Sequence, residues 1–266
     1  MTGLIRDNLE KYFTKESTVR VCINALKKYL NIENTDLIIE PSAGKGAFIK
    51  DLKELSNNYR FYDISPENEE IFKQDFLKLE VSNLRFFERI HIIGNPPFGR
   101  QSTLAKKFIK KSCEFGETVS FILPKSFKKE SFKKTFPLDF WLKVEIDLPD
   151  NSFTVNGVSH DVPCVFQIWE KRNTQRKLPI KLEPKDFKFV KINEKPDVSF
   201  RRVGVNAGTI STNTEKSESS HYFIKFDNFN ETILNKIKGV TFLNDNTVGP
   251  KSISKPEIIE EFNKVI

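Results

Sequence analysis

Long apolar runs, paired cysteines and clusters of metal ligands are all scarce in this 266-residue chain. No window contains the ~20 consecutive apolar residues that a helix needs to cross a bilayer, so we expect no membrane partner. The three cysteines, Cys22, Cys113 and Cys164, are far apart and odd in number, which argues against a disulfide framework or a zinc site. We expect buried free thiols. The three histidines are also scattered, so no metal site is predicted.

The N-terminal residues 1–13 contain no apolar core of the kind that a signal peptide has. We therefore expect a cytoplasmic or nuclear location without a secretion signal. The chain has a formal net charge of +7. Such a surplus attracts polyanions over long distances and favours a nucleic-acid partner, although many basic proteins bind none.

Short apolar segments alternate with amphipathic helical segments up to about residue 172. This alternation predicts a Rossmann-like, doubly wound α/β domain with a mostly parallel sheet. The last two predicted strands, 140–149 and 162–171, are joined by a short connection and predict an antiparallel hairpin at one edge. The predicted strands before them are 37–39, 60–65, 89–95 and 118–124, and the predicted helices are 17–30, 48–55 and 103–115.

The composition changes at residues 172–186, which are charged and contain proline, as is typical of an exposed connection. We therefore predict a catalytic domain at residues 1–172 and a small C-terminal extension at residues 173–266. The extension is too short and polar for an independent catalytic domain. One arrangement that we consider is that it adds strands to the sheet and contacts the substrate.

The segment EPSAGKG, from Glu40 to Gly46, follows the first predicted strand. Its glycines permit a sharp turn into a helix and a close approach of a ligand to the backbone. The third glycine of a dinucleotide fingerprint is missing, which favours a nucleoside ligand over a pyrophosphate. Asp63 ends the next strand, about 20 residues further on, where an acidic side chain commonly binds ribose hydroxyls. An ordinary glycine turn beside an aspartate at the end of a strand is the structural alternative.

The segment Asn95-Pro96-Pro97-Phe98 follows a buried strand, so we expect it at the ligand-binding edge of the sheet. Prolines have no N–H, so this backbone offers carbonyl acceptors with few competing donors. The Asn95 side chain adds one more acceptor. Two acceptors suit an exocyclic amino group, and Phe98 offers a face on which a base can stack. The segment therefore predicts a site that holds a planar ring and directs its amino nitrogen.

In this order, EPSAGKGAF, YDIS, QDF and NPPF resemble the motifs of S-adenosylmethionine-dependent amino-methyltransferases, and their arrangement is similar to the gamma class of DNA adenine-N6 enzymes. The resemblance covers residues 10–170. It implies a class I methyltransferase fold and S-adenosylmethionine as cofactor. It assigns Asn95, Pro96, Pro97 and Phe98 to the target amino group and ring. It assigns the cofactor to Phe13, Thr14, Glu40, Ser42, Ala43, Gly44, Gly46, Asp63, Ile64, Asp75 and Phe76.

The resemblance implies transfer of a methyl group to adenine N6 in nucleic acid, with DNA more expected than RNA. Phe153 lies where family members often place an aromatic residue against the extruded base, and Arg201 and Arg202 are candidates for phosphate contacts. Three alternatives stay open. They are an RNA adenine-N6 or guanine-N2 methyltransferase, a protein-glutamine methyltransferase, and an inactive binding subunit. The basic charge argues against the protein substrate, and the intact motifs argue against an inactive subunit.

Overall fold

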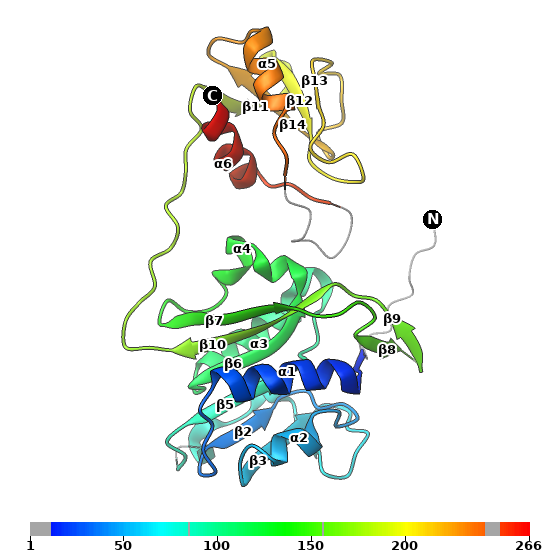
Figure 1. Ribbon diagram of the computed structural model, residues 1–266, viewed down its shortest axis with the longest axis vertical. Helices are drawn as coiled ribbons and strands as arrows, with labels where there is room; N and C mark the ends of the chain where they lie inside the picture. The colour runs from blue at the N-terminus through cyan, green and yellow to red at the C-terminus, as the bar shows by residue number, and fades with distance from the viewer. Residues whose placement is uncertain (1–11, 85, 156, 243–250) are drawn as a thin grey trace. The chain divides into compact units, whose positions relative to one another are not determined.

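The computed structural model describes residues 12–84, 86–155, 157–242 and 251–266, so most of the segment considered as a possible signal peptide lies outside the described residues. The chain divides into two compact units, Met1–Leu178 and Pro179–Ile266 (Figure 1). Each unit has its own sheet and hydrophobic core. Among the described residues, no helix has the length and apolar character needed to cross a membrane.

The first unit alternates strands with helices, close to the predicted positions. Its α-helices are α1 (Glu16–Tyr29), α2 (Ile49–Lys53), α3 (Thr103–Cys113) and α4 (Glu130–Lys133). Its strands are β1 (Phe13–Thr14), β2 (Leu37–Glu40), β3 (Asn58–Asp63), β4 (Phe72–Lys73), β5 (Ile90–Gly94), β6 (Thr118–Pro124), β7 (Phe140–Asp147), β8 (Phe153–Val155), β9 (Val158–His160) and β10 (Cys164–Lys171).

Seven of these strands form one sheet in the order β4-β3-β2-β5-β6-β10-β7. The pairs from β4 through to β6 are parallel, whereas β10 is antiparallel to both β6 and β7. The predicted Rossmann-like class I methyltransferase fold, with a mostly parallel sheet and an antiparallel pair at one edge, is therefore confirmed. The carboxyl ends of β2, β3 and β5 meet at one edge, and this is where the motif residues lie.

Two cores cover the two faces of this sheet, because alternate residues of a strand point to opposite sides. Ile38 of β2 packs in one core with the apolar faces of α1 and α2, and its neighbour Ile39 packs in the other core with α3. Strands β2, β5 and β6 are buried along their whole length, as expected for strands between helical layers. The three cysteines are buried and free, which confirms that prediction.

A second, three-stranded sheet has the order β1-β8-β9. It joins the start of the described chain to the hairpin that follows β7, and Phe13 and Thr14 pair with Thr154 and Phe153. This pairing was not predicted from the sequence. It fixes the N-terminal strand beside the residues that follow β5, as the site geometry below shows.

The second unit contains a four-stranded antiparallel sheet in the order β11-β14-β12-β13. Its elements are β11 (Phe187–Val190), β12 (Val198–Arg201), β13 (Ile210–Ser211), β14 (His221–Phe226), α5 (Glu231–Lys238) and α6 (Lys255–Val265). Phe200, Ile224 and Phe262 are fully buried in its core. The arrangement in which this segment adds strands to the central sheet is therefore wrong, because the strands pair with one another around a core of their own.

Candidate active site

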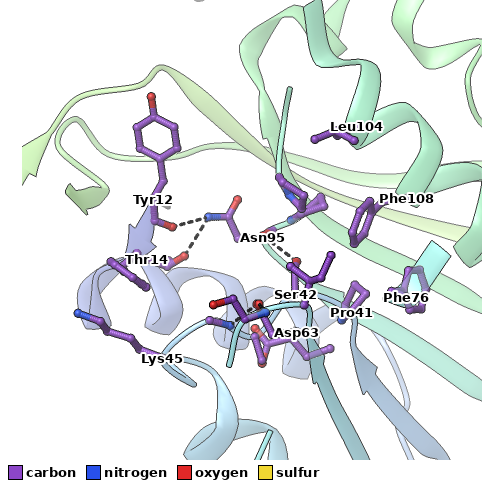
Figure 2. A pocket seen from close by; sticks show the side chains of 18 of the residues that line it. Tyr12, Thr14, Pro41, Ser42, Lys45, Asp63, Phe76, Asn95, Leu104 and Phe108 are labelled. Atoms are coloured by element: carbon purple, nitrogen blue, oxygen red, sulfur yellow. Dashed lines mark hydrogen bonds between the residues drawn. The ribbon is translucent and has the colours of Figure 1, made fainter. Parts of the chain in front are cut away.

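A cavity of about 510 Å³ opens at the carboxyl ends of β2, β3 and β5. This volume lies in the range of small-molecule and cofactor pockets. Figure 2 shows that its wall is built from segments far apart in the sequence. The predicted site residues that line it are Phe13, Thr14, Glu40, Ser42, Ala43, Gly44, Asp63, Ile64, Asp75, Phe76, Asn95, Pro96, Pro97 and Phe98.

The turn after β2 forms the floor of the cavity and is tied to the end of β3. The N–H of Ala43 donates to the carbonyl of Tyr62 at 2.8 Å, and the N–H of Gly44 donates to Asp63 Oδ2, also at 2.8 Å. Gly46 has a φ of +84°, and a Cβ there would lie 2.6 Å from Ile49 Cδ1. Gly46 is therefore required by the turn itself, and unlike Gly44 it is not among the residues that line the cavity.

Two acidic side chains follow the glycine turn along the cavity wall. Asp63 accepts from the N–H of Gly44 and, through Oδ1, from the N–H of Ser65 at 2.8 Å. Asp75 caps the next short helical turn by accepting from Leu77 N–H at 3.0 Å. These bonds fix both carboxylates, so each has a defined direction toward a ligand.

The apolar part of the wall lies between these carboxylates and helix α3. Ile64 is 57% exposed although it is a large hydrophobic residue, so it offers an open apolar surface inside the cavity. Phe76 stacks on Phe108 with ring centroids 5.4 Å apart. Phe108 and Leu104, both on α3, line the cavity and were not predicted. The sequence signal that could have identified them is that they are apolar residues of the helix that directly follows NPPF.

Glu40 is buried at the end of β2, with only 2% of its surface exposed. Its Oε2 has no hydrogen-bond partner. Burial raises the pKa of this carboxyl to about 8, and the nearby Asp63 adds to the effect. A buried polar atom without a partner is costly in a folded protein, so it marks a place where a ligand would supply the missing interaction.

The Asn95–Phe98 loop is held from both sides. Ser42 Oγ donates to the Asn95 carbonyl at 3.0 Å, and the carbonyl of Phe98 accepts from the N–H groups of Leu104 and Ala105 at 3.1 and 3.2 Å. The Asn95 side chain donates through Nδ2, while its Oδ1 is buried and has no partner. The loop therefore contains two prolines without N–H groups beside an unsatisfied oxygen acceptor.

Residues of β1 close one side of the cavity. Lys45 of the glycine turn places its Nζ 4.2 Å from the centre of the Phe13 ring, a cation–π contact. Tyr12 and Thr14 both contact the Asn95 side chain (Figure 2). Lys45 and Tyr12 were not among the predicted site residues. A lysine between two glycines has no local pattern that identifies such a contact.

Phe153 does not reach the cavity. Its side chain is fully buried in the core of the first unit, where the edge of the Tyr12 ring packs against it at a centroid distance of 6.3 Å. A ring that is covered in this way has no face on which a base can stack. The predicted base contact for Phe153 is therefore wrong in this structure, and Tyr12 is the aromatic side chain that lines the cavity at this place.

Arg201 and Arg202 lie in the second unit, at the end of β12. Arg201 Nε donates to the carbonyl of Val203, and Arg202 Nη2 donates to the carbonyl of Ser219 at 2.8 Å. Their role as phosphate contacts stays a prediction.

The lysine-rich stretch after β6 is largely paired with acidic side chains of β7. Lys125 and Lys128 lie 3.5 and 3.1 Å from Asp147, and Lys133 lies 3.3 Å from Glu145. These ion pairs offset part of the positive charge at this edge. The stretch is thus first of all a structural contact between two parts of the first unit.

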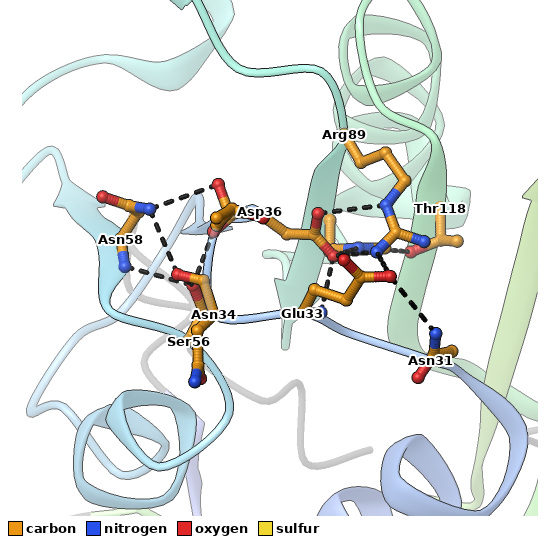
Figure 3. Close-up of polar contacts among 10 residues, drawn as sticks. Asn31, Glu33, Asn34, Asp36, Ser56, Asn58, Arg89 and Thr118 are labelled. Atoms are coloured by element: carbon orange, nitrogen blue, oxygen red, sulfur yellow. Dashed lines mark hydrogen bonds and ion pairs between the residues drawn. The ribbon is translucent and has the colours of Figure 1, made fainter.

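A second polar cluster lies at the opposite, amino-terminal edge of the sheet (Figure 3). Asp36, which is 3% exposed, accepts from Arg89 at 2.8 and 3.0 Å, and His91 Nε2 lies 3.1 Å from it. His91 Nδ1 lies 2.8 Å from Thr118 Oγ1. Burial lowers the pKa of His91, so the ring is neutral at pH 7. The cluster ties the starts of β2, β5 and β6 together and is remote from the cavity.

Comparison with known proteins adds relatives of this fold. A ribosomal RNA small subunit methyltransferase A from Francisella tularensis subsp. novicida is 30% identical over 105 residues. That match covers 34% of this chain and 40% of the relative, so the chain matches less than half of that enzyme's length.

Two solved structures are similar to this chain at low sequence identity. A Pyrococcus horikoshii protein with a provisional assignment as an RNA methyltransferase is 15% identical, with 65% of this chain and 93% of that chain covered and a TM-score of 0.47. The 23S rRNA methyltransferase ErmE is 14% identical, with 62% and 71% covered and a TM-score of 0.46. At TM-scores below 0.5 neither similarity decides what this chain binds.

The match to a family of domains is more extensive. Residues 31–179 match the EDM2 methyltransferase-like domain, and this range spans more than half of the chain. It includes the central sheet from β2 to β10 and the cavity walls formed by the glycine turn, the acidic residues after β3 and the Asn95 loop. The chain therefore belongs to the EDM2 methyltransferase-like domain family.

Proposed function

We propose that the chain is an S-adenosylmethionine-dependent methyltransferase that modifies the N6 amino group of adenine in nucleic acid. The observation that carries this proposal is the state of Asn95, whose buried Oδ1 has no partner beside two prolines that offer no competing N–H. An amino group has two N–H donors, which this oxygen and a neighbouring carbonyl match. Membership of a methyltransferase-like family supports the class of reaction.

The residues of the cavity fit this cofactor. The buried carboxyl of Glu40 has an unpartnered oxygen that matches the positive amino group of the methionine part. The oriented carboxylates of Asp63 and Asp75 match the ribose hydroxyls and the adenine amino group, and the exposed Ile64 offers apolar surface to the adenine ring. Phe76 is 1% exposed and stacks on Phe108, so it has little free surface for the ring. Phe13, Thr14, Ser42, Ala43 and Gly44 complete the wall. When bound, S-adenosylmethionine supplies an electrophilic methyl group.

The Asn95 loop would act on the target amino nitrogen. The lone pair of this nitrogen is delocalised into the ring, which makes it a weak nucleophile. Acceptors at Asn95 Oδ1 and at the Pro96 carbonyl favour the tetrahedral nitrogen of the transition state over the planar ground state. Phe98 offers a face on which the ring can stack. Because a stacked base is out of reach, the base would have to leave the helix or belong to a single strand.

Two polymers are candidates for the substrate. The order of the sequence motifs favours DNA, whereas the curated relative from Francisella is named for ribosomal RNA. The net charge of +7 suits either polymer. The methyl-transfer assay therefore includes both DNA and RNA.

A methyl-transfer assay tests the proposal. The wild type, Asn95→Ala and Asn235→Ala are incubated with labelled S-adenosylmethionine and duplex DNA, single-stranded DNA or RNA, and the nucleosides are identified by mass spectrometry. Asn235→Ala is the matched control, because Asn235 is exposed on α5 of the second unit. We expect N6-methyladenine with the wild type and the control, and a loss of at least ~100-fold with Asn95→Ala.

Each other product would change the proposal in a defined way. N2-methylguanine would preserve the cofactor and the amino-group chemistry and overturn the choice of base. The absence of any methylated nucleoside while S-adenosylmethionine still binds would overturn the nucleic-acid substrate.

A further inference from the structure

The side chain of Asn95 is held by the N-terminal strand β1. Its Nδ2 donates to Thr14 Oγ1 at 3.2 Å and is 3.4 Å from the main-chain oxygen of Tyr12 (Figure 2). Its Oδ1 is buried and receives no hydrogen bond. One end of the amide is therefore fully engaged, and the other end is left as an acceptor without a donor.

The main-chain carbonyl of Tyr12 determines the orientation of the Asn95 side-chain amide. A main-chain carbonyl accepts hydrogen bonds and cannot donate, so the amide group facing it has to be the NH₂ group. The reversed amide would place Oδ1 against the Tyr12 oxygen and leave two N–H donors at the reactive end. Those donors would oppose the N–H groups of an amino substrate.

The position of β1 is set by a distant part of the chain. Phe13 and Thr14 pair with β8, and the Lys15 N–H and the Thr18 hydroxyl both donate to the carbonyl of Ser152, at 3.1 and 3.2 Å. The Tyr12 ring also packs against His160 of β9 at a centroid distance of 5.4 Å. The β8–β9 hairpin therefore holds the two groups that contact Asn95.

We propose that Thr14 and the main-chain carbonyl of Tyr12 are positioning groups for Asn95, which lock its amide so that Oδ1 remains the free acceptor for the target amino group. The assignment deepens the proposed function and rests on it. Thr14 acts through Asn95 and is a positioning residue. Its hydroxyl has two lone pairs and one proton, so it can accept from Asn95 and still donate to a bound cofactor.

Three variants separate this role from simple structural support. Thr14→Val removes the hydroxyl and keeps a branched side chain suited to a strand, whereas Thr14→Ser restores the hydroxyl. Thr154→Val is the matched control, because Thr154 lies on β8 opposite Phe13 in the same small sheet and is not a partner of Asn95. We expect Thr14→Val to lower kcat about five- to ten-fold at saturating cofactor and substrate, with kcat recovered in Thr14→Ser and unchanged in Thr154→Val.

A double-mutant cycle tests whether Thr14 works through Asn95. In the Asn95→Ala background, Thr14→Val should change the residual single-turnover rate less than about two-fold, because the group that Thr14 positions is gone. Equal losses in both backgrounds would overturn the proposal. So would an unchanged kcat of Thr14→Val at saturation, whatever happens to the affinity for S-adenosylmethionine.

A readout independent of catalysis is the NMR signal of the Asn95 side-chain NH₂, assigned by its loss in Asn95→Asp. This signal should shift in Thr14→Val and stay in place in Thr154→Val. An unchanged signal in Thr14→Val overturns the contact. If the wild type transfers no methyl group to any substrate while this signal still shifts, the proposed function falls and the positioning contact stands.

Discussion

The two units of this protein differ in whether their buried polar side-chain atoms have hydrogen-bond partners. In the first unit, Glu40 Oε2 and Asn95 Oδ1 are buried in the cavity wall without partners. Among the described residues of the second unit, no buried side-chain nitrogen or oxygen lacks a partner, and the buried Ser199 hydroxyl donates to the carbonyl of Asn213 at 2.7 Å. Ser112 Oγ and Ser120 Oγ of the first unit are also buried without partners, but these residues do not line the cavity. Unsatisfied polar atoms destabilise a fold, so the two that line the cavity are the ones whose cost a bound ligand could offset.

Two cationic side chains of the second unit lie over aromatic rings, as Lys45 lies over Phe13 in the first unit. The Arg202 guanidinium lies 5.3 Å from the centre of the Tyr222 ring, and Lys255 lies 4.7 Å from that of Phe189. Both rings are partly buried and pack against the hydrophobic core of the second unit. Within its described residues, the second unit therefore has buried polar side chains that are all paired, whereas the first unit has two unpaired ones in its cavity wall.

The largest expected effect is on the core of the second unit. Phe200→Ala removes a fully buried ring and should lower the free energy of unfolding of this unit by about 3–5 kcal/mol. Because the unit has its own core, binding of S-adenosylmethionine by the first unit should stay within about two-fold, a margin worth ~0.4 kcal/mol. Chemical denaturation and calorimetric titration measure the two effects. The control is Val205→Ala, since Val205 is 96% exposed. Loss of cofactor binding in Phe200→Ala would show that the first unit depends on the folding of the second.

The next effect distinguishes two glycines with similar backbone conformations. Gly46 and Gly157 have φ values of +84° and +78°, but only at Gly46 would an added Cβ meet a neighbour, Ile49, at 2.6 Å. Gly46→Ala should destabilise the first unit by about 1–3 kcal/mol and weaken cofactor binding, whereas Gly157→Ala should cost about 1 kcal/mol and leave binding unchanged. Thermal unfolding and titration with S-adenosylmethionine test both. Equal effects of the two variants would show that contact in the glycine turn is irrelevant.

A pH titration tests whether the unpartnered carboxyl of Glu40 binds the positive charge of the cofactor. Burial raises the pKa of Glu40 to about 8, so the group is mostly protonated at pH 7 in the ligand-free chain. A positively charged ligand favours the ionised form, so affinity for S-adenosylmethionine should rise from pH 6 toward pH 8 by up to about ten-fold per pH unit and then level off. Glu40→Gln should abolish most of this dependence. A wild-type affinity that is flat over this range would contradict the assignment.

The contribution of Glu40 to the stability of the ligand-free chain should fall as pH rises, whereas the affinity for the cofactor should rise. Because the folded pKa of Glu40 lies above its unfolded value of 4.5, the contribution of this group to stability is complete below pH 4.5 and is lost as pH rises through 8. The difference in stability between wild type and Glu40→Gln, measured by denaturation at several pH values, isolates this contribution. An increase in the wild-type advantage with pH would contradict the raised pKa.

The smallest expected effect is at Arg202 of the second unit, which is half-buried. Arg202→Ala should raise KM for nucleic acid a few-fold and lower the salt dependence of binding by about one unit of slope, since a phosphate contact acts through charge. Arg202→Lys should keep most of the binding because it preserves the charge. Filter binding at several salt concentrations measures this. An unchanged salt slope in Arg202→Ala would remove Arg202 from the predicted substrate contacts.

Local sequence patterns were sufficient to predict most of the first unit. The fully buried strands β2, β5 and β6 were visible as short apolar runs, and the alternation with helices predicted the parallel sheet. The residues expected at the site follow three of the strands, and the ends of parallel strands meet at one edge. This is why Glu40, Asp63 and Asn95 line one cavity, although the roles proposed for them are still to be measured.

The errors arose where contacts depend on packing between distant segments. Phe153 was expected at a base, but the pairing of β8 with β1 buries it under Tyr12. The possible extension of the main sheet by the C-terminal strands failed because strand pairing partners are chosen by tertiary packing. Leu104 and Phe108 were expected only as part of the predicted helix 103–115, but both also line the cavity.

The sequence by itself determined the order of secondary-structure elements and the chemistry placed at the strand ends, because apolar periodicity and turn residues act over a few positions along the chain. Only the tertiary structure decided how that chemistry is oriented. Thr14 and Asn95 are 81 positions apart, and the contact between them exists because β1 pairs with a hairpin that follows β7. No local pattern encodes such a contact, since its free energy comes from the packing of the whole unit.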